Sequence, residues 1–144
     1  MTPMHDLSSA PLRIARPTGD LAAAERFWVD GVGLEVQWRT DASAEGGHRL
    51  TMVGPAGGSW HLELVDDPQS AAEARPTDED LLVVYLGEPA SDAWISRIES
   101  AGGVRVAARN PYWDTWGATL RDPDGYLFVL CCRDWDSKEG SGAR

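Results

Sequence analysis

The sequence predicts an α+β fold made of two βαβββ modules, each a strand followed by a helix and three further strands. Two observations predict it. Strand-like and helix-like patterns occur in the same order twice, and the second copy follows the first at a nearly constant offset of about 70 residues. The matching positions are Leu12 with Leu82, residues 33–36 with 103–106, Gly47 with Gly117, and residues 62–64 with 128–130, where the shift is about four residues shorter.

The first module is expected over residues 11–66. A strand at residues 12–16 ends at Pro17, and Thr18 or Asp20 can cap the helix that follows. Apolar side chains then recur at helical spacing, at Leu21, Ala24, Phe27 and Trp28, until Gly31 and Gly33 end the helix. The remaining strands are expected at residues 34–38, 48–53 and 60–65, the last two joined by a turn rich in glycine.

The second module is expected over residues 81–133, after an acidic connection at residues 67–80 with prolines and no apolar period. Its strands are expected at residues 81–86, 104–107, 117–122 and 126–132, with a helix capped by Ser91 or Asp92 after the first of them. The turn Asp122-Pro123-Asp124-Gly125 suits a tight hairpin. Residues 1–10 and 134–144 are expected to be flexible tails around a single domain.

Composition excludes several classes of partner. A formal net charge of -10 with no basic patch argues against nucleic acid and against anionic membrane surfaces. No apolar run approaches the roughly 18 residues of a membrane span, and the first ten residues do not resemble a signal peptide, so a cytoplasmic location is expected. The adjacent cysteines Cys131 and Cys132 cannot bridge each other on a strand and are interpreted as packing residues.

The run from Gly117 to Tyr126, together with the helix that opens at Asp20 and closes at Phe27-Trp28 and Gly31-Val32-Gly33, resembles the vicinal oxygen chelate superfamily of glyoxalases, bleomycin-resistance proteins and extradiol dioxygenases. The resemblance covers residues 11–133. It implies that each module curls into an open half-barrel, and that the two half-barrels face each other within one chain or across a homodimer. The ligand would lie on the concave side.

Metal-dependent members of this superfamily place one ligand on the first strand and one on the last strand of each module. The four corresponding positions here are Arg13, Glu63, Val83 and Val129. Only Glu63 can bind a cation, because valine has no donor atom and a guanidinium repels one. We therefore expect no metal and no cofactor. His61 shares a strand face with Glu63, but two ligands on one strand rarely suffice for a metal site.

Strand parity predicts a mixed polar and apolar concave face, which suits an organic ligand with a hydrogen-bonding head. The residues assigned to this face are Arg13, Ala15, Arg49, Thr51, His61, Glu63, Val83, Tyr85, Thr119, Arg121, Leu127 and Val129. Arg13 is expected to pair with Glu63, either as a ligand anchor or as a structural ion pair. An aromatic loop with Tyr112, Trp113 and Trp116, together with Trp38, could stack on a planar or cationic ligand, pack on itself or form a dimer contact.

Three functions stay open. The first is a metal-independent small-molecule binding protein of the bleomycin-resistance type, which would sequester an aromatic or cationic compound in a concave groove. The second is a metal-dependent lyase, isomerase or dioxygenase of the same superfamily, which Glu63 favours and the other three positions oppose. The third is a protein-interaction module anchored by exposed tryptophans. The residues favour the first function and argue against an enzyme.

Overall fold

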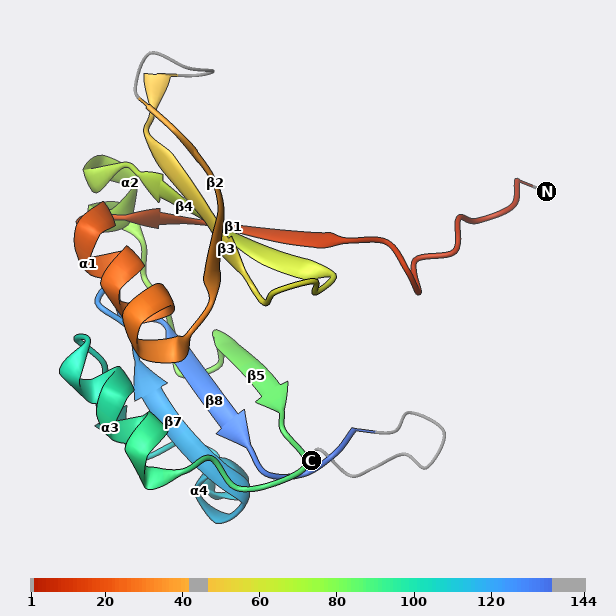
Figure 1. Cartoon of the computed structure of the whole chain (residues 1–144), viewed down its shortest axis with the longest axis vertical. Helices are drawn as coiled ribbons and strands as arrows, with labels where there is room; N and C mark the ends of the chain where they lie inside the picture. Colours follow the sequence, from red (N-terminus) through yellow and green to blue (C-terminus); the bar gives the residue numbers. More distant parts are fainter. Residues whose placement is uncertain (1, 42–46, 136–144) are drawn as a thin grey trace.

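The computed structural model describes residues 2–41 and 47–135 and contains the two predicted βαβββ modules (Figure 1). Residues 1 and 136–144 of the expected tails lie outside the described residues. The strands of module one are β1 (Leu12–Thr18), β2 (Glu35–Thr40), β3 (Leu50–Gly54) and β4 (Trp60–Asp66), in the sheet order β1-β4-β3-β2. Those of module two are β5 (Leu81–Tyr85), β6 (Val104–Val106), β7 (Gly117–Arg121) and β8 (Leu127–Cys131), in the order β5-β8-β7-β6. In each sheet the first strand runs parallel to the last, so the predicted fold class is confirmed.

The helix of each module begins at a side-chain cap. Asp20 accepts a hydrogen bond from the backbone N–H of Ala23 at 3.0 Å and starts α1 (Leu21–Glu25). The same helix continues as a π-helix, η1 (Arg26–Val32), and ends at Gly33, whose φ of 96° is left-handed. In module two, Ser91 accepts from the N–H of Trp94 at 3.1 Å and starts α3 (Asp92–Ser100). The caps place both helices where the sequence predicts them.

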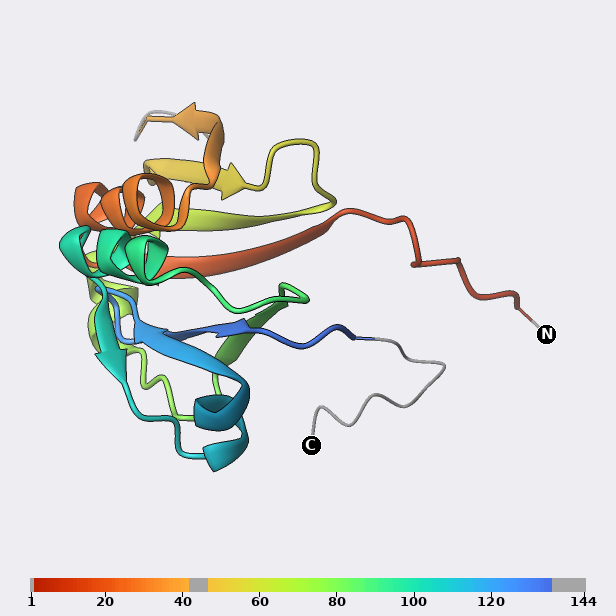
Figure 2. The ribbon, with the colours of Figure 1, turned by 60° about the horizontal axis from the view of Figure 1, so that its bottom comes forward.

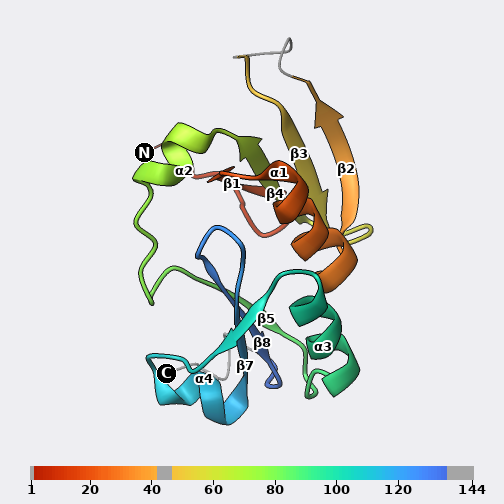
Figure 3. The same cartoon turned by 90° about the vertical axis from the view of Figure 1, so that its left-hand side faces the viewer.

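A shared core holds the two modules together. Figures 2 and 3 show α1 and α3 side by side, and η1 packs directly on α3. The indole of Trp28 makes edge-to-face contacts with Phe27 from its own helix, at 4.8 Å between ring centroids, and with Phe128 of β8, at 5.1 Å. The inner faces of both sheets cover this cluster, which leaves the opposite face of each sheet turned away from the helices. We call that opposite face the concave face.

Two short helices were not predicted. The connection between the modules contains α2 (Pro68–Glu73), capped by Asp67, and the aromatic loop forms α4 (Pro111–Trp116), capped by Asn110. Both have proline at the start of the first turn, where its missing N–H and fixed φ cost nothing. A helix of six residues is too short to show an apolar period, so only the cap and the proline could have indicated it. No helix among the described residues is long and apolar enough to cross a membrane.

Candidate functional site

The concave face of module one carries a hydrogen-bonded group centred on Arg13. Its Nη1 donates to Glu63 Oε2 at 3.0 Å, and its Nε donates to His61 Nε2 at 3.0 Å. Its Nη2 lies 3.5 Å from the sulfur of Met52. The predicted Arg13–Glu63 pair is therefore present, with the Arg13 side chain 52% exposed and that of Glu63 16% exposed. We call Arg13, His61, Glu63 and Met52 the Arg13 cluster.

The hydrogen bond from Arg13 fixes the proton on His61. A guanidinium can only donate, so Nε2 of His61 must accept with a bare lone pair and Nδ1 must carry the hydrogen of the neutral ring. The Glu63 carboxylate balances the charge of Arg13, because the two groups are in direct contact. The cluster thus offers N–H donors from a neutralised ion pair and has little net charge.

Strand β3 corrects part of the predicted face. Residues opposite each other in an antiparallel pair share a face, so Met52, opposite Glu63, is concave, whereas Thr51, opposite Leu64, faces the helices. The Thr51 hydroxyl donates to Glu25 of α1, and hydrogen bonds from Arg39 and Thr51 lower the pKa of Glu25.

Arg49 also leaves the predicted concave set, because it pairs with Asp66 and lines the same hollow as Glu25 and Thr51. The assignment of β3 was wrong because Leu50, Met52 and Val53 are all apolar, so hydropathy does not distinguish its two faces. Met52 is the site residue that parity missed.

The pairing of the first strand with the last strand in each module differs by two residues from the pairing that the internal sequence alignment implies. The directly opposite pairs are Val83 with Val129, Arg13 with His61, and Ala15 with Glu63. Val83 and Val129 lie directly opposite each other, but Arg13 and Glu63 do not. In module one, the pair equivalent to Val83 and Val129 is therefore either Arg13 with His61 or Ala15 with Glu63. A slip of two residues keeps every side chain on its face, which is why the sequence pattern did not reveal it.

The donor set of these positions does not fit a divalent metal ion. Either register leaves one possible ligand, His61 beside Arg13 or Glu63 beside Ala15, together with two valines. In both cases the guanidinium of Arg13 lies within hydrogen-bonding distance of that ligand. Within residues 2–41 and 47–135, no three His, Cys, Asp or Glu side chains gather closely enough to hold a metal ion.

Helix α4 covers the concave face of module two. Trp113 was one of the residues predicted to stack on a ligand, to pack within the loop or to form a dimer contact; its side chain is 3% exposed and packs against Val129 and Cys131 of β8. Its Nε1 is buried without a hydrogen-bond partner among the described residues, as is the hydroxyl of Thr119, which lies opposite Val129 in the sheet. In this structure Trp113 belongs to the core of module two.

The other predicted aromatic residues lie around this helix. Tyr112 contacts Trp113 edge to face at 5.0 Å between centroids, and Trp116 is 39% exposed. Arg133 and Trp135 also belong to this aromatic group. The sequence analysis missed them because they follow the last strand. Arg133 stacks over Trp116 at 4.7 Å and donates to the Tyr112 hydroxyl, and Trp135 lies 5.9 Å from Tyr85.

The two remaining predicted site residues lie at the edges of the modules. Trp38, on β2 opposite Met52, is 52% exposed and borders the Arg13 cluster. Arg121 is exposed at the end of β7, opposite Leu127. The structure therefore brings Arg13, His61 and Glu63 together and does not bring the two arginines or all the tryptophans into one group.

Known proteins resemble the chain along most of its length. Residues 12–65 match the YycE-like N-terminal domain, and residues 79–132 match the YycE-like C-terminal domain. YycE of Bacillus subtilis strain 168, a protein of unknown function, is 34% identical over 123 residues, which are 85% of this chain and 87% of YycE. The crystal structure of a YycE protein from Bacillus subtilis, described as a candidate glyoxalase or fosfomycin resistance protein, aligns with a TM-score of 0.74 at 30% identity over 90% of this chain and 93% of that one.

Two proteins of Streptomyces sp. CB03234 have the same fold. A glyoxalase/bleomycin resistance protein aligns with a TM-score of 0.56 at 25% identity, over 85% of this chain and 99% of that one. TnmS3, an antibiotic binding protein, aligns with a TM-score of 0.60 at 25% identity, over 88% of this chain and 98% of that one. The chain therefore belongs to the YycE-like family, within the vicinal oxygen chelate superfamily of glyoxalases and of bleomycin- and fosfomycin-resistance proteins.

Proposed function

We propose that the protein binds a ring-containing organic molecule on the concave face of module one, without a metal ion. The observation that carries the proposal is the Arg13 cluster itself. Where the superfamily holds a cation between carboxylates and imidazoles, this chain has a guanidinium bonded to both Glu63 and His61. A cluster so arranged can recognise a hydrogen-bond acceptor and has no place for a cation.

The surroundings of the cluster suit such a ligand. Trp38 offers an exposed indole, and Met52 supplies an adaptable, polarizable surface beside it. Arg13 uses three N–H directions within the cluster, and a guanidinium has five N–H groups, so donors remain for a ligand oxygen. The net charge of -10 favours the approach of cationic compounds over anionic ones.

Two relatives support a binding role. TnmS3, at 25% identity, is an antibiotic binding protein, and a second similar structure, also at 25% identity, is a glyoxalase/bleomycin resistance protein. We extend the proposed site to Tyr85, Arg121, Tyr112 and Trp116, which would contact the ligand from module two, while the buried Trp113 would hold α4 in place behind them. We also propose that the protein is cytoplasmic and forms a homodimer. Light scattering on purified protein would test the homodimer.

The first binding test titrates the protein with metal-free bleomycin and detects binding by tryptophan fluorescence. A panel of ring-containing compounds is then screened by thermal shift. Arg13→Met should abolish binding of any ring-containing compound from this panel that the wild type binds. The matched control is Arg49→Met, which removes an equally exposed arginine from an ion pair outside the Arg13 cluster. Unchanged affinity of Arg13→Met would contradict the anchor role and leave a structural ion pair.

Elemental analysis with metal titration tests the metal-free part separately. Purified protein should contain no stoichiometric nickel, zinc, manganese or iron and should bind none tightly. Tight binding of one equivalent would overturn the proposal in favour of a metal-dependent lyase, isomerase or dioxygenase. Replacing Glu63 by Gln would then show whether that carboxylate is a ligand.

A further inference from the structure

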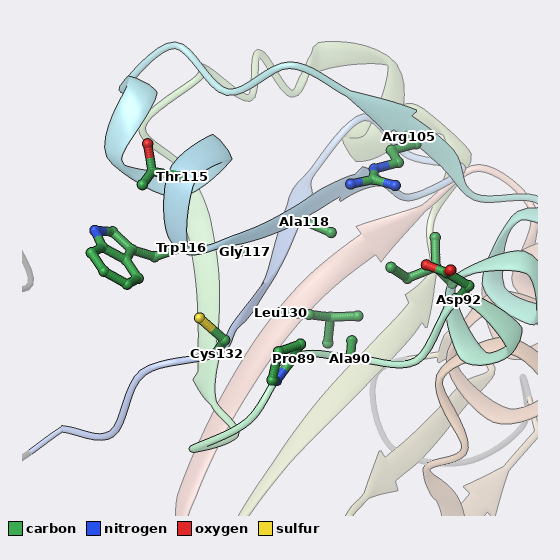
Figure 4. A pocket seen from close by; sticks show the side chains of 11 residues that line it. Pro89, Ala90, Asp92, Arg105, Thr115, Trp116, Gly117, Ala118, Leu130 and Cys132 are labelled. Atoms are coloured by element: carbon green, nitrogen blue, oxygen red, sulfur yellow. The ribbon is translucent and has the colours of Figure 1, made fainter.

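Module two contains a cavity on the helix side of its sheet, away from the concave face. It has a volume of about 240 Å³ and lies between the start of α3, strands β6 and β7, and the end of α4 (Figure 4). Its wall includes Ala118 and Leu130, which face the helices and belong to the shared core. A ligand here would therefore be on the opposite side of the sheet from Val129 and Trp113.

Two opposite charges lie at one end of this cavity. Arg105 is on β6 opposite Leu120, a core residue, so its side chain projects on the helix side, and Asp92 is in the first turn of α3 (Figure 4). The two side chains form no ion pair with each other. Neither makes a hydrogen bond with any side chain or backbone group in the described part of the chain. A guanidinium and a carboxylate, both exposed to solvent, thus border one space, and neither side chain is held by another protein group in the described part of the chain.

Apart from the hydroxyl group of Thr115, the other side chains that line the cavity are mostly apolar, and the cavity ends at an aromatic ring. Ala118, Leu130 and Ala90 line the middle, and Trp116 and Cys132 lie at the end away from the charges (Figure 4). Pockets for drug-sized ligands have volumes of roughly 300–1,000 Å³. At about 240 Å³ this cavity suits a smaller molecule.

We propose that this cavity binds a small zwitterion with an apolar tail, such as an α-amino acid with an aliphatic side chain. The ligand carboxylate would pair with Arg105 and its ammonium group with Asp92. The tail would lie along Ala118 and Leu130 toward Trp116. Charge-assisted hydrogen bonds at both groups would select the zwitterion over molecules that carry only one of the charges.

The test is isothermal titration of the full chain with L-leucine, raised to about 10 mM so that even a Kd of about 1 mM is measurable. Leucinamide lacks the carboxylate and N-acetyl-L-leucine lacks the ammonium group, and each should bind about tenfold more weakly or worse. Arg105→Gln and Asp92→Asn should each weaken L-leucine binding by a similar factor. The control is Arg109→Gln, an exposed arginine close to Arg105 in the chain that does not line the cavity.

The proposal fails if the wild type binds no L-leucine, or if both variants bind it as tightly as the wild type does. It also fails if leucinamide and N-acetyl-L-leucine bind as well as L-leucine. Arg13→Met should leave L-leucine binding unchanged, because Arg13 does not line this cavity. Loss of L-leucine binding in Arg13→Met would assign the amino acid to the concave face instead. Thermal melting of each variant checks that the exposed side chains were replaced without unfolding.

Discussion

Asp122 should make the protein less stable as the pH rises toward neutrality. Its side chain is 6% exposed in the tight turn between β7 and β8, and its Oδ1 accepts hydrogen bonds from the backbone N–H groups of Asp124 and Tyr126, both at 2.9 Å. Burial outweighs these bonds and the nearby charge of Arg16, and it raises the pKa of Asp122 from 3.8 to about 6. The folded state therefore binds this proton more tightly than the unfolded chain does.

The sign and size of the effect follow from that pKa. A raised carboxyl pKa contributes stability that is complete below the unfolded value of 3.8 and is lost as the pH rises through about 6. The shift is about two units, and each unit is worth about 1.4 kcal/mol, so the full loss is about 3 kcal/mol. Roughly half of it falls between about pH 5 and about pH 7.

Asp122→Asn isolates this contribution. The amide stays neutral at every pH and its oxygen can accept the same two N–H groups, so the penalty for burying a charge disappears. Urea unfolding of both proteins, followed by tryptophan fluorescence between about pH 5 and about pH 7, gives the free energy of unfolding at each pH. The variant should gain about 1.3 kcal/mol relative to the wild type across this range.

Other carboxylates do not obscure the comparison. Hydrogen bonds lower the pKa of Glu25, Asp67 and Asp80, and the stability that they contribute is lost at acid pH, but they are present in both proteins and cancel in the difference. Asp78→Asn, at an exposed position, is the control and should show no such trend. A difference independent of pH, or a variant that loses stability relative to the wild type as the pH rises, would refute the reasoning.

Further predictions concern packing, capping and exposure. Gly31→Ala should lower the free energy of unfolding by about 1–3 kcal/mol. The new methyl carbon would lie 3.0 Å from a side-chain carbon and 3.1 Å from a backbone carbon of the α3 segment. Gly19→Ala, where the nearest atom is 3.8 Å away, is the control in the same urea assay. Ser91→Ala should cost about 1 kcal/mol in thermal unfolding, because it removes the cap of α3, and restoration by Thr would verify the cause. A ligand on the concave face of module one should quench the fluorescence of the exposed Trp38 more than that of the buried Trp113. Trp38→Phe should therefore reduce the quenching, and Trp113→Phe should retain it. The reverse result would place the ligand on module two.

The elements that the sequence predicted are those with a period or a strong cap. All eight strands and both long helices appear close to the predicted bounds, because alternation, glycine termination and the Asp20 and Ser91 caps are local signals that tertiary contacts here reinforce. The π-helical geometry of residues 26–32 has no such signal. Helices α2 and α4 were missed because one and a half turns cannot establish an apolar period.

The candidate site was predictable where parity was unambiguous. Arg13, His61 and Glu63 lie on strands whose neighbouring residues are plainly apolar, and the structure brings all three into contact. Met52 was missed because the apolar residues of β3 occupy both of its faces. Trp113 was assigned to an open loop because nothing in a six-residue aromatic segment indicates that a helix turns this ring into the sheet.

The differences between the two modules bear on where a ligand can bind. A duplicated fold provides two concave faces, and here helix α4 fills the second with Trp113, while no helix within the described residues covers the Arg13 cluster of the first. Around Val129 the second face keeps two buried polar atoms, on Trp113 and Thr119, that have no hydrogen-bond partner among residues 2–41 and 47–135. Each such group costs about 1–3 kcal/mol of stability. A ligand oxygen that accepted hydrogen bonds from Trp113 Nε1 and the Thr119 hydroxyl would recover part of this lost stability, but the ligand would first have to displace α4. The open first face imposes no such barrier, and for that reason we place the anchor of the proposed ligand at Arg13 and assign module two only a secondary contact surface.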